Sequence, residues 1–347
     1  MKKILSIALA AAMMCSLAAC GEKPSTGNED PDNVGENGQY SVTIRLAHDS
    51  QPNLPTSDLM EVFEKEVEER SNGQIQIEMY PNGQLSGNNA QTTANLLTNG
   101  DIDMAVLNSV TTQRWEIYKF PYLFTSLEDA YKCEDGESGR YMLDTLEEDA
   151  NVHGICYLDV GFRVFTGKEA FNDVNALQGK KLRIINSTTF TEFAKALNAN
   201  PVSTSMGELY TALQQGAADC QENPLSVINS QGFHNVTPYI TMTNHVWNAY
   251  VLGVNLDFWN TLPDEAKAVL EEVSTEISAE HRTRSEARES EFQTKLESEG
   301  ATIVELTDAE REAWAAVGRS THQTLEDLVG AEVVDVFYKD LGIEKSW

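Results

Sequence analysis

The sequence predicts an α/β protein made of two lobes, and three features support this prediction. First, the chain has 347 residues, which is too many for a single ordinary hydrophobic core. Second, strand-like segments alternate with helix-like segments, first over residues 41–107 and again over residues 182–254. Third, one predicted helix, residues 263–299, is long enough to reach from one lobe to the other.

The first lobe opens with a βαβαβ pattern. Residues 41–47 and 74–80 alternate between apolar and polar side chains, as half-buried strands do. Residues 56–70 and 88–98 carry apolar side chains at helical spacing, and residues 102–107 are typical of a buried strand. This order predicts a parallel sheet covered by helices.

A similar pattern follows in the second half of the chain. Residues 182–185 are typical of a short strand, residues 188–197 and 207–215 of helices, and residues 246–254 of a buried strand that returns across the protein. We place the boundary between the lobes near residues 159–163.

The long helix predicted over residues 263–299 starts at Pro263 and meets no further proline or glycine before Gly300. Its length would be roughly 55 Å, more than one lobe can cover. Its middle, residues 278–291, is almost wholly polar, which is typical of a helix that bridges two packed bodies. A coiled coil is the alternative, but the apolar heptads do not persist.

These segments assign the body of the chain to two lobes. Lobe I comprises residues 40–160 and about 249–288, and lobe II comprises residues 161–248 and about 289–347. Hydrophobic residues make up 41% of the chain and charged residues 23%, as in soluble globular proteins.

The N-terminus predicts export. Two lysines precede an apolar run over residues 4–17, which is too short to span a bilayer. The string LAAC that follows resembles the lipobox of bacterial lipoproteins, so we expect residues 1–19 to be a signal peptide and Cys20 to carry a lipid. The alternative is ordinary secretion with loss of Cys20. Residues 20–39 then form the anchor and a flexible tether.

Charge excludes one class of partner. Asp and Glu number 54 against 25 Lys and Arg, a formal net charge of −29, which repels nucleic acid and anionic lipid headgroups. Beyond the N-terminal segment only Cys133, Cys156 and Cys220 remain, without CxxC spacing. We therefore expect buried free thiols, although one disulfide stays possible, and we expect no metal site and no cofactor.

Sequence motifs of catalysis are missing. The chain has no GxSxG, no HExxH, no P-loop and no GxGxxG after a strand, and its six histidines form no pair at metal-ligand spacing. A catalytic thiolate at Cys220 is disfavoured because its acidic neighbours Asp219 and Glu222 raise the pKa of a thiol. We expect the protein not to be an enzyme.

Two arginines stand out in this acidic chain. Arg183 lies within the strand KKLRIINS, on the face opposite to its apolar neighbours, and Arg163 follows a strand-like segment in VGFRVFTG. A guanidinium in a strand needs a partner, and its planar fork fits a carboxylate. The partner is either one of the many acidic side chains or an anionic ligand, which the global field would otherwise repel.

Several longer strings carry a family resemblance. The strings QIQIEMYPNGQLSG, LTNGDIDMAVLNS, GFRVFTGK, ALQGKKLRIINS and MGELYTALQQGAADCQENPLSVI occur in order within residues 41–270. They resemble the DctP-type solute-binding proteins of TRAP transporters. The resemblance implies a two-lobed, type II-like periplasmic-binding-protein fold, or Venus flytrap, with a long lobe-bridging helix. It also implies capture of small organic acids outside the cytoplasm and delivery to a membrane permease.

The resemblance also assigns roles in lobe II. The arginine of the family's strand motif, here Arg183 with Asn186 nearby, clamps the ligand carboxylate, and the QENP asparagine, here Asn223, donates its amide to the same group. The GxR arginine, here Arg163, faces the cleft. Cys220 stands where the family usually has glycine, which implies a spacer and no thiol chemistry.

On the other wall, His48 and Asn108 follow the first and third strands, and Asn88 opens a helix after the QLSG loop. Met206 is expected to supply apolar cover for the ligand, although a place in the core explains it equally well. The sialic-acid branch has an acidic residue and an arginine after the third strand, whereas this chain has the neutral run NSVT, which disfavours sialic acid. Only His48 offers a cation to a second carboxylate. We therefore expect a hydroxylated monocarboxylate, such as a uronate, before a dicarboxylate.

Two other functions stay open from the sequence alone. The same fold serves as a ligand sensor docked on a membrane kinase, and a secreted enzyme is the remaining alternative. For the transport receptor we expect an extracytoplasmic, membrane-anchored monomer.

Overall fold

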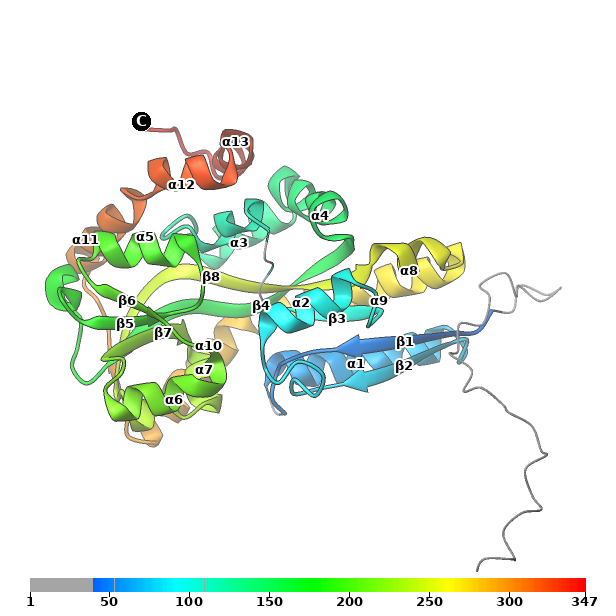
Figure 1. The fold of residues 1–347 in the computed structure, drawn as a ribbon, viewed down its shortest axis with the longest axis horizontal. Coiled ribbons are helices and arrows are strands. Elements are labelled where there is room, and N and C mark those ends of the chain that lie inside the picture. Colours follow the sequence, from blue (N-terminus) through cyan, green and yellow to red (C-terminus); the bar gives the residue numbers. More distant parts are fainter. Residues whose placement is uncertain (1–39, 53, 109, 111) are drawn as a thin grey trace, which may run out of the picture. The chain divides into compact units, whose positions relative to one another are not determined.

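The structure is a computed structural model, and it describes residues 40–347 apart from residues 53, 109 and 111. The predicted signal peptide, Cys20 and the tether lie outside these described residues. Contacts within the chain group Tyr40–Trp347 into one unit. In this unit nine strands form one sheet, with helices on both sides of it (Figure 1).

Two groups of short parallel strands are joined through a long antiparallel pair. β1 pairs in parallel with β2 and β3, and β5 pairs in parallel with β6 and β7. The strands β4 and β8, of 16 and 17 residues, run side by side between the two groups. The bounds are β1 Val42–Ala47, β2 Ile75–Tyr80, β3 Met104–Leu107, β4 Val152–Gly167, β5 Lys181–Ile184, β6 Asn200–Ser203, β7 Cys220–Pro224, β8 Tyr239–Asn255 and β9 Thr302–Val304.

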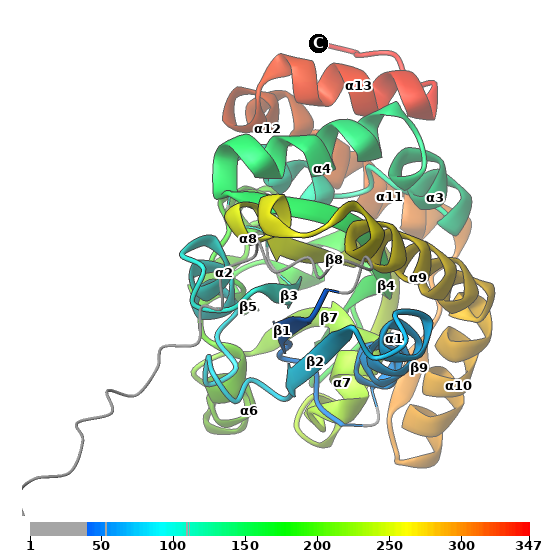
Figure 2. The same ribbon diagram turned by 90° about the vertical axis from the view of Figure 1, so that its right-hand side faces the viewer.

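The helices cover both faces, with α4, α12 and α13 on one side of the sheet and α1 and α7 on the other (Figure 2). Their bounds are α1 Pro55–Arg70, α2 Ala90–Thr98, η1 Arg114–Lys119, α3 Leu127–Glu134, α4 Glu137–Ala150, η2 Val174–Leu177, α5 Thr188–Ala196, α6 Met206–Gln215, α7 Leu225–Ser230, η3 Phe233–Asn235, α8 Leu256–Thr261, α9 Asp264–Thr283, α10 Ser285–Ser298, α11 Asp308–Arg319, α12 His322–Val329 and α13 Ala331–Leu341.

The region predicted as a turning point between lobes contains an irregular stretch of β4. The pairing of β4 with β8 shifts register between Asp159 and Gly161 and again between Arg163 and Phe165. Gly161 has φ 120°, a conformation that side chains with a Cβ rarely adopt. β4 therefore bends where it passes from one strand group to the other.

The long helix predicted over residues 263–299 is two helices in the structure. α9 and α10 meet at Arg284, whose φ of −107° and ψ of 1° interrupt the helix. α9 packs on α1 and β4, whereas α10 packs on α7. The pair thus connects elements of both strand groups, as predicted, but it does so with a break in the middle.

The polar middle of this helix pair has partners on β4. Ser278 Oγ donates a hydrogen bond to the carbonyl oxygen of Tyr157 at 2.7 Å, and His281 Nε2 donates to the carbonyl oxygen of Asp159 at 3.0 Å. Bulged strands leave backbone groups without ladder partners, and polar side chains can satisfy them. The polar residues therefore dock the helix pair against β4.

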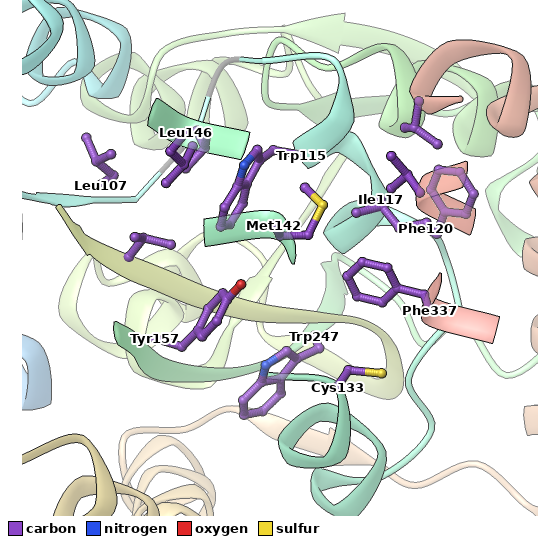
Figure 3. Packing of buried hydrophobic residues seen from close by; sticks show 14 of the residues in the cluster. Leu107, Trp115, Ile117, Phe120, Cys133, Met142, Leu146, Tyr157, Trp247 and Phe337 are labelled. Atoms are coloured by element: carbon purple, nitrogen blue, oxygen red, sulfur yellow. The ribbon is translucent and has the colours of Figure 1, made fainter. Parts of the chain in front are cut away.

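The C-terminal helices pack differently from the sequence assignment. The sequence predicts that residues from about 289 to 347 belong to lobe II, yet α12 contacts η1, and α13 contacts η1, α3 and α4. Phe337 of α13 lies in the same buried cluster as Met142 and Leu146 of α4 (Figure 3). Periodicity shows that such a helix has an apolar face, but it does not show which helix covers that face. The other lobe bounds stay a prediction.

Candidate functional site

A cavity of about 630 Å³ lies between the two groups of parallel strands. It is lined by the loop after β1, the start of α2, the end of β3 and η1 from one group, and by β4, β5, β7 and the start of α6 from the other. The structure brings together all the predicted ligand residues except His48: Arg163, Arg183, Asn186, Asn223, Asn88, Asn108 and Met206.

His48 does not line the cavity, and it is buried, with 2% of its surface exposed. Its backbone N–H donates to Tyr80 and its carbonyl oxygen accepts from Gly83. Burial lowers the pKa of His48, which favours the neutral ring. The next residue, Asp49, lines the cavity in its place. The expected candidate for a second cation is therefore absent from the cavity wall.

Arg163 is held by a buried acidic partner. Its Nε and Nη2 donate to the carboxylate of Glu222, and Nη2 also donates to the carbonyl oxygen of Glu222 at 2.9 Å. Nη2 donates to Asn223 Oδ1 at 3.1 Å, and Nη1 donates to Asn248 Oδ1 at 3.0 Å. The Arg163 guanidinium thus positions two amides that line the cavity.

Glu222 neutralises Arg163 at neutral pH. Burial by itself raises the pKa of this carboxyl group, but Arg163 and His245 outweigh burial and lower the pKa to about 2. The ring nitrogen Nε2 of His245 lies 3.5 Å from Glu222 Oε2. Sequence reasoning missed the role of Glu222 because the pairing of β7 with β4 brings it to Arg163, which is 59 residues away in the chain.

Arg183 is the buried cation that has no acidic partner. Its Nε and Nη2 donate to the carbonyl oxygen of Thr204 at 3.0 and 2.6 Å, and its Nη1 has no hydrogen-bond partner. No carboxylate among the described residues forms a salt bridge with Arg183, although the residue is only 1% exposed. Burial lowers the pKa of Arg183 to about 10, so the guanidinium stays charged at neutral pH.

Of the two expected partners of Arg183, the described residues do not supply the acidic side chain, and the anionic ligand stays a prediction. A buried charge is costly unless it is paired, and the described residues supply no counterion. The guanidinium lines a cavity, so a bound anion can supply the missing charge.

Asn223, on β7, lines the same cavity as Arg183. Its Nδ2 donates to Gln221 Oε1 at 2.5 Å, while Arg163 holds its Oδ1. The amide NH₂ group has two hydrogens, so one remains for a ligand. The Asn108 Oδ1 atom on the opposite wall has no hydrogen-bond partner.

η1 contributes an ion pair to the cavity wall that sequence reasoning did not predict. Lys119 Nζ donates to Glu116 Oε1 at 2.5 Å, and Glu116 Oε2 accepts from Ser187 Oγ at 2.5 Å and from the backbone N–H of Thr189 at 3.2 Å. Burial raises the pKa of Glu116, but Lys119 and these donors outweigh it and lower the pKa. Lys119 is therefore a neutralised cation.

Cys133, Cys156 and Cys220 are free and buried, as predicted. Burial raises the pKa of the Cys220 thiol to about 12, so a thiolate is not populated at neutral pH. Within residues 40–347 as described, no cluster of His, Cys, Asp and Glu is arranged to hold a metal ion.

A second cavity of about 300 Å³ lies against the junction of α9 and α10. Its wall carries the acidic residues Asp159, Glu286, Glu289 and Glu305 with one basic residue, Arg288. This excess of negative charge disfavours the binding of an anion, so the larger cavity is the better candidate for an anion-binding site.

Comparison with known proteins decides the family. The profile of the bacterial extracellular solute-binding protein family 7, DctP, matches residues 46–327. The chain belongs to this family. The C4-dicarboxylate-binding periplasmic protein DctP of Rhodobacter capsulatus is 29% identical over 299 residues, which is 84% of this chain and 89% of that protein.

Solved structures of TRAP periplasmic solute-binding proteins have the same fold. The protein from Ochrobactrum anthropi is 31% identical with a TM-score of 0.79, covering 87% of this chain and 95% of that chain. The protein from Shewanella oneidensis, with bound succinate, is 27% identical with a TM-score of 0.80, covering 87% and 99%. The predicted family and the two-lobed fold are confirmed.

The family consists of solute-binding receptors that act outside the cytoplasm. No helix within the described residues has both the length and the apolar character needed to cross a membrane.

Proposed function

We propose that this DctP-family protein captures a small carboxylate, an organic acid or a sugar acid such as a uronate, and delivers it to a TRAP permease in the membrane. The observation that carries the proposal is Arg183, a buried guanidinium that lines the cavity and has no acidic partner among the residues that the structure describes. A ligand carboxylate supplies its counterion and accepts charge-assisted hydrogen bonds.

Capture then proceeds by closure. The ligand carboxylate accepts hydrogen bonds from Arg183 and from the Asn223 amide on one wall, while Asn88 and Asn108 meet the rest of the ligand from the other wall. A ligand that touches both walls stabilises the closed state through contacts that the open state lacks. Asn186 and Met206 border the same space.

The N-terminal segment is consistent with a receptor held at the cell membrane. Residues 1–19 act as a signal peptide, and a lipid on Cys20 holds the protein at the outer face of the membrane through residues 20–39. Tethering to the membrane that contains the permease raises the effective concentration of the two partners. The receptor acts as a monomer in this proposal.

The test is a thermal-shift and calorimetry panel of organic and sugar acids with the wild type and Arg183→Ala. A bound ligand raises the melting temperature because it binds only the native state. Removing one partner of a buried charge pair costs about 2–5 kcal/mol, so we expect Arg183→Ala to weaken binding by roughly 30-fold or more.

Arg319→Ala serves as the matched control, because Arg319 forms an ion pair with Glu312 on the surface and should leave the affinity unchanged. Wild-type affinity in Arg183→Ala would show that the clamp is assigned to the wrong residue.

A further inference from the structure

Asp49 is a carboxylate in the cavity wall that has no cationic partner. It lies two residues after the end of β1 and is partly buried. Its Oδ1 accepts from Ser86 Oγ at 2.6 Å and from Thr93 Oγ1 at 2.9 Å, and its Oδ2 lies 3.0 Å from the same threonine hydroxyl. No Lys, Arg or His of the described chain lies within salt-bridge distance of this carboxylate.

These two hydroxyls fix the orientation of Asp49 without neutralising it. Ser86 belongs to the loop after β2, and Thr93 belongs to α2, so the carboxylate is held from two elements. An ionised carboxylate offers about four lone-pair sites, and Oδ2 has only the one shared contact. Asp49 can therefore accept further hydrogen bonds from a ligand.

The charges of the cavity wall leave one cation and one anion unpaired. Arg163 is neutralised by Glu222, and Lys119 is neutralised by Glu116. Arg183 remains as the unpaired cation, and Asp49 remains as the unpaired anion. One ligand carboxylate satisfies Arg183, but a second carboxylate in the same cavity would meet no free cation and would be repelled by Asp49.

Neutral amides accompany Asp49 along this wall. Asn88, Asn89, Gln91 and Asn108 also line the cavity, and Asn108 Oδ1 has no hydrogen-bond partner. Hydroxyl groups donate to carboxylate and amide oxygens and accept from amide N–H groups, so a ligand with several hydroxyls matches both kinds of group on this wall.

We propose that Asp49 recognises hydroxyl groups on the part of the ligand that lies away from Arg183, so that the cavity selects a polyhydroxylated monocarboxylate and rejects a dicarboxylate. This inference rests on the proposed function and specifies its ligand class. It sets the selectivity of this chain apart from the dicarboxylate named for its Rhodobacter relative.

The test compares D-gluconate and D-glucuronate with succinate by calorimetry on the full secreted chain. We expect the wild type to bind at least one of the two hydroxy acids at least 10-fold more tightly than succinate. Asp49→Asn keeps the shape of the side chain but removes its charge. In this variant the ratio of the affinity for the hydroxy acid to the affinity for succinate should fall by at least 10-fold. The reason is that the second carboxylate of succinate is no longer repelled and that an amide oxygen accepts hydrogen bonds from ligand hydroxyls less strongly than a carboxylate does.

Asp144→Asn is the control for loss of one negative charge, because Asp144 is exposed on α4 and does not line the cavity. The ratio of its affinities for the hydroxy acids and for succinate should equal that of the wild type.

Two results would overturn the role of Asp49. One is a wild type that binds succinate as tightly as both hydroxy acids, and this comparison stands even where Asp49→Asn does not fold. The other is an unchanged preference in folded Asp49→Asn. In both cases loss of binding in Arg183→Ala would leave the proposed function intact, whereas a wild type that binds no carboxylate would refute both.

Discussion

Arg163 and Arg183 show how the same residue type acquires two different roles in one cavity. Both are buried and both line the cavity, yet Arg163 has the acidic partner Glu222, whereas Arg183 has none within the described part of the chain. Arg163 therefore holds the neighbouring amides of Asn223 and Asn248 in place, while Arg183 keeps its charge for a ligand.

The buried pair can be tested through Glu222→Gln. Removing this carboxylate leaves the Arg163 guanidinium buried without a counterion, which should lower the free energy of unfolding by about 3–5 kcal/mol in urea titrations at pH 7. Glu312→Gln breaks an exposed pair with Arg319 and should cost less than about 1 kcal/mol. Equal losses in the two variants would contradict the importance of burial.

The same pair predicts a dependence of stability on pH. The pKa of Glu222 is lowered from 4.5 to about 2, so its contribution is fully present above pH 4.5 and is lost as the pH falls toward 2. The difference in unfolding free energy between the wild type and Glu222→Gln should shrink over this range.

At the scale of elements, α12 is docked through a buried histidine. Nε2 of His322 donates to the carbonyl oxygen of Pro121 at 2.7 Å, so its Nδ1 accepts from the Tyr338 hydroxyl of α13 at 2.6 Å. Protonation of Nδ1 would remove this acceptor. Burial disfavours the charged ring and lowers the pKa of His322 from 6.5 to about 4.

Acid should therefore loosen the C-terminal helices. Because the folded-state pKa lies below that of the unfolded chain, the unfolded state binds more protons, and stability is lost as the pH falls from 6.5 to 4. Hydrogen exchange of α12 and α13, corrected for intrinsic rates, should show less protection at pH 5 than at pH 7.5. His322→Gln should lack this dependence, and an identical slope in the variant would assign the effect to another group.

At the scale of the whole molecule, few elements join the two strand groups. The strands β4 and β8 and the helix pair α9–α10 run between them, and β4 bends near Gly161. Such a connection permits a hinge motion of the two walls around the cavity.

Closure should be visible by small-angle scattering. We expect the radius of gyration of the wild type to fall on saturation with a tightly bound carboxylate, and we expect no change in Arg183→Ala at the same ligand concentration. A wild type that binds the ligand by calorimetry without any compaction would contradict capture by closure.

Local sequence patterns predicted much of this protein. Strand alternation and helical periodicity are set by near neighbours, and they predicted the parallel strands and the bridging helix region. The number and spacing of the cysteines predicted the buried free thiols. The motif strings around Arg163, Arg183 and Asn223 identified the family. Most of the residues expected to bind the ligand line one cavity in the structure.

Only the tertiary structure decided which charges are paired. Glu222 neutralises Arg163 and Glu116 neutralises Lys119. His48 is buried and does not line the cavity, whereas Asp49 does. The C-terminal helices likewise found their partners on α3 and α4. These outcomes depend on strand pairing and on packing between residues that are far apart in the chain, which no local pattern specifies.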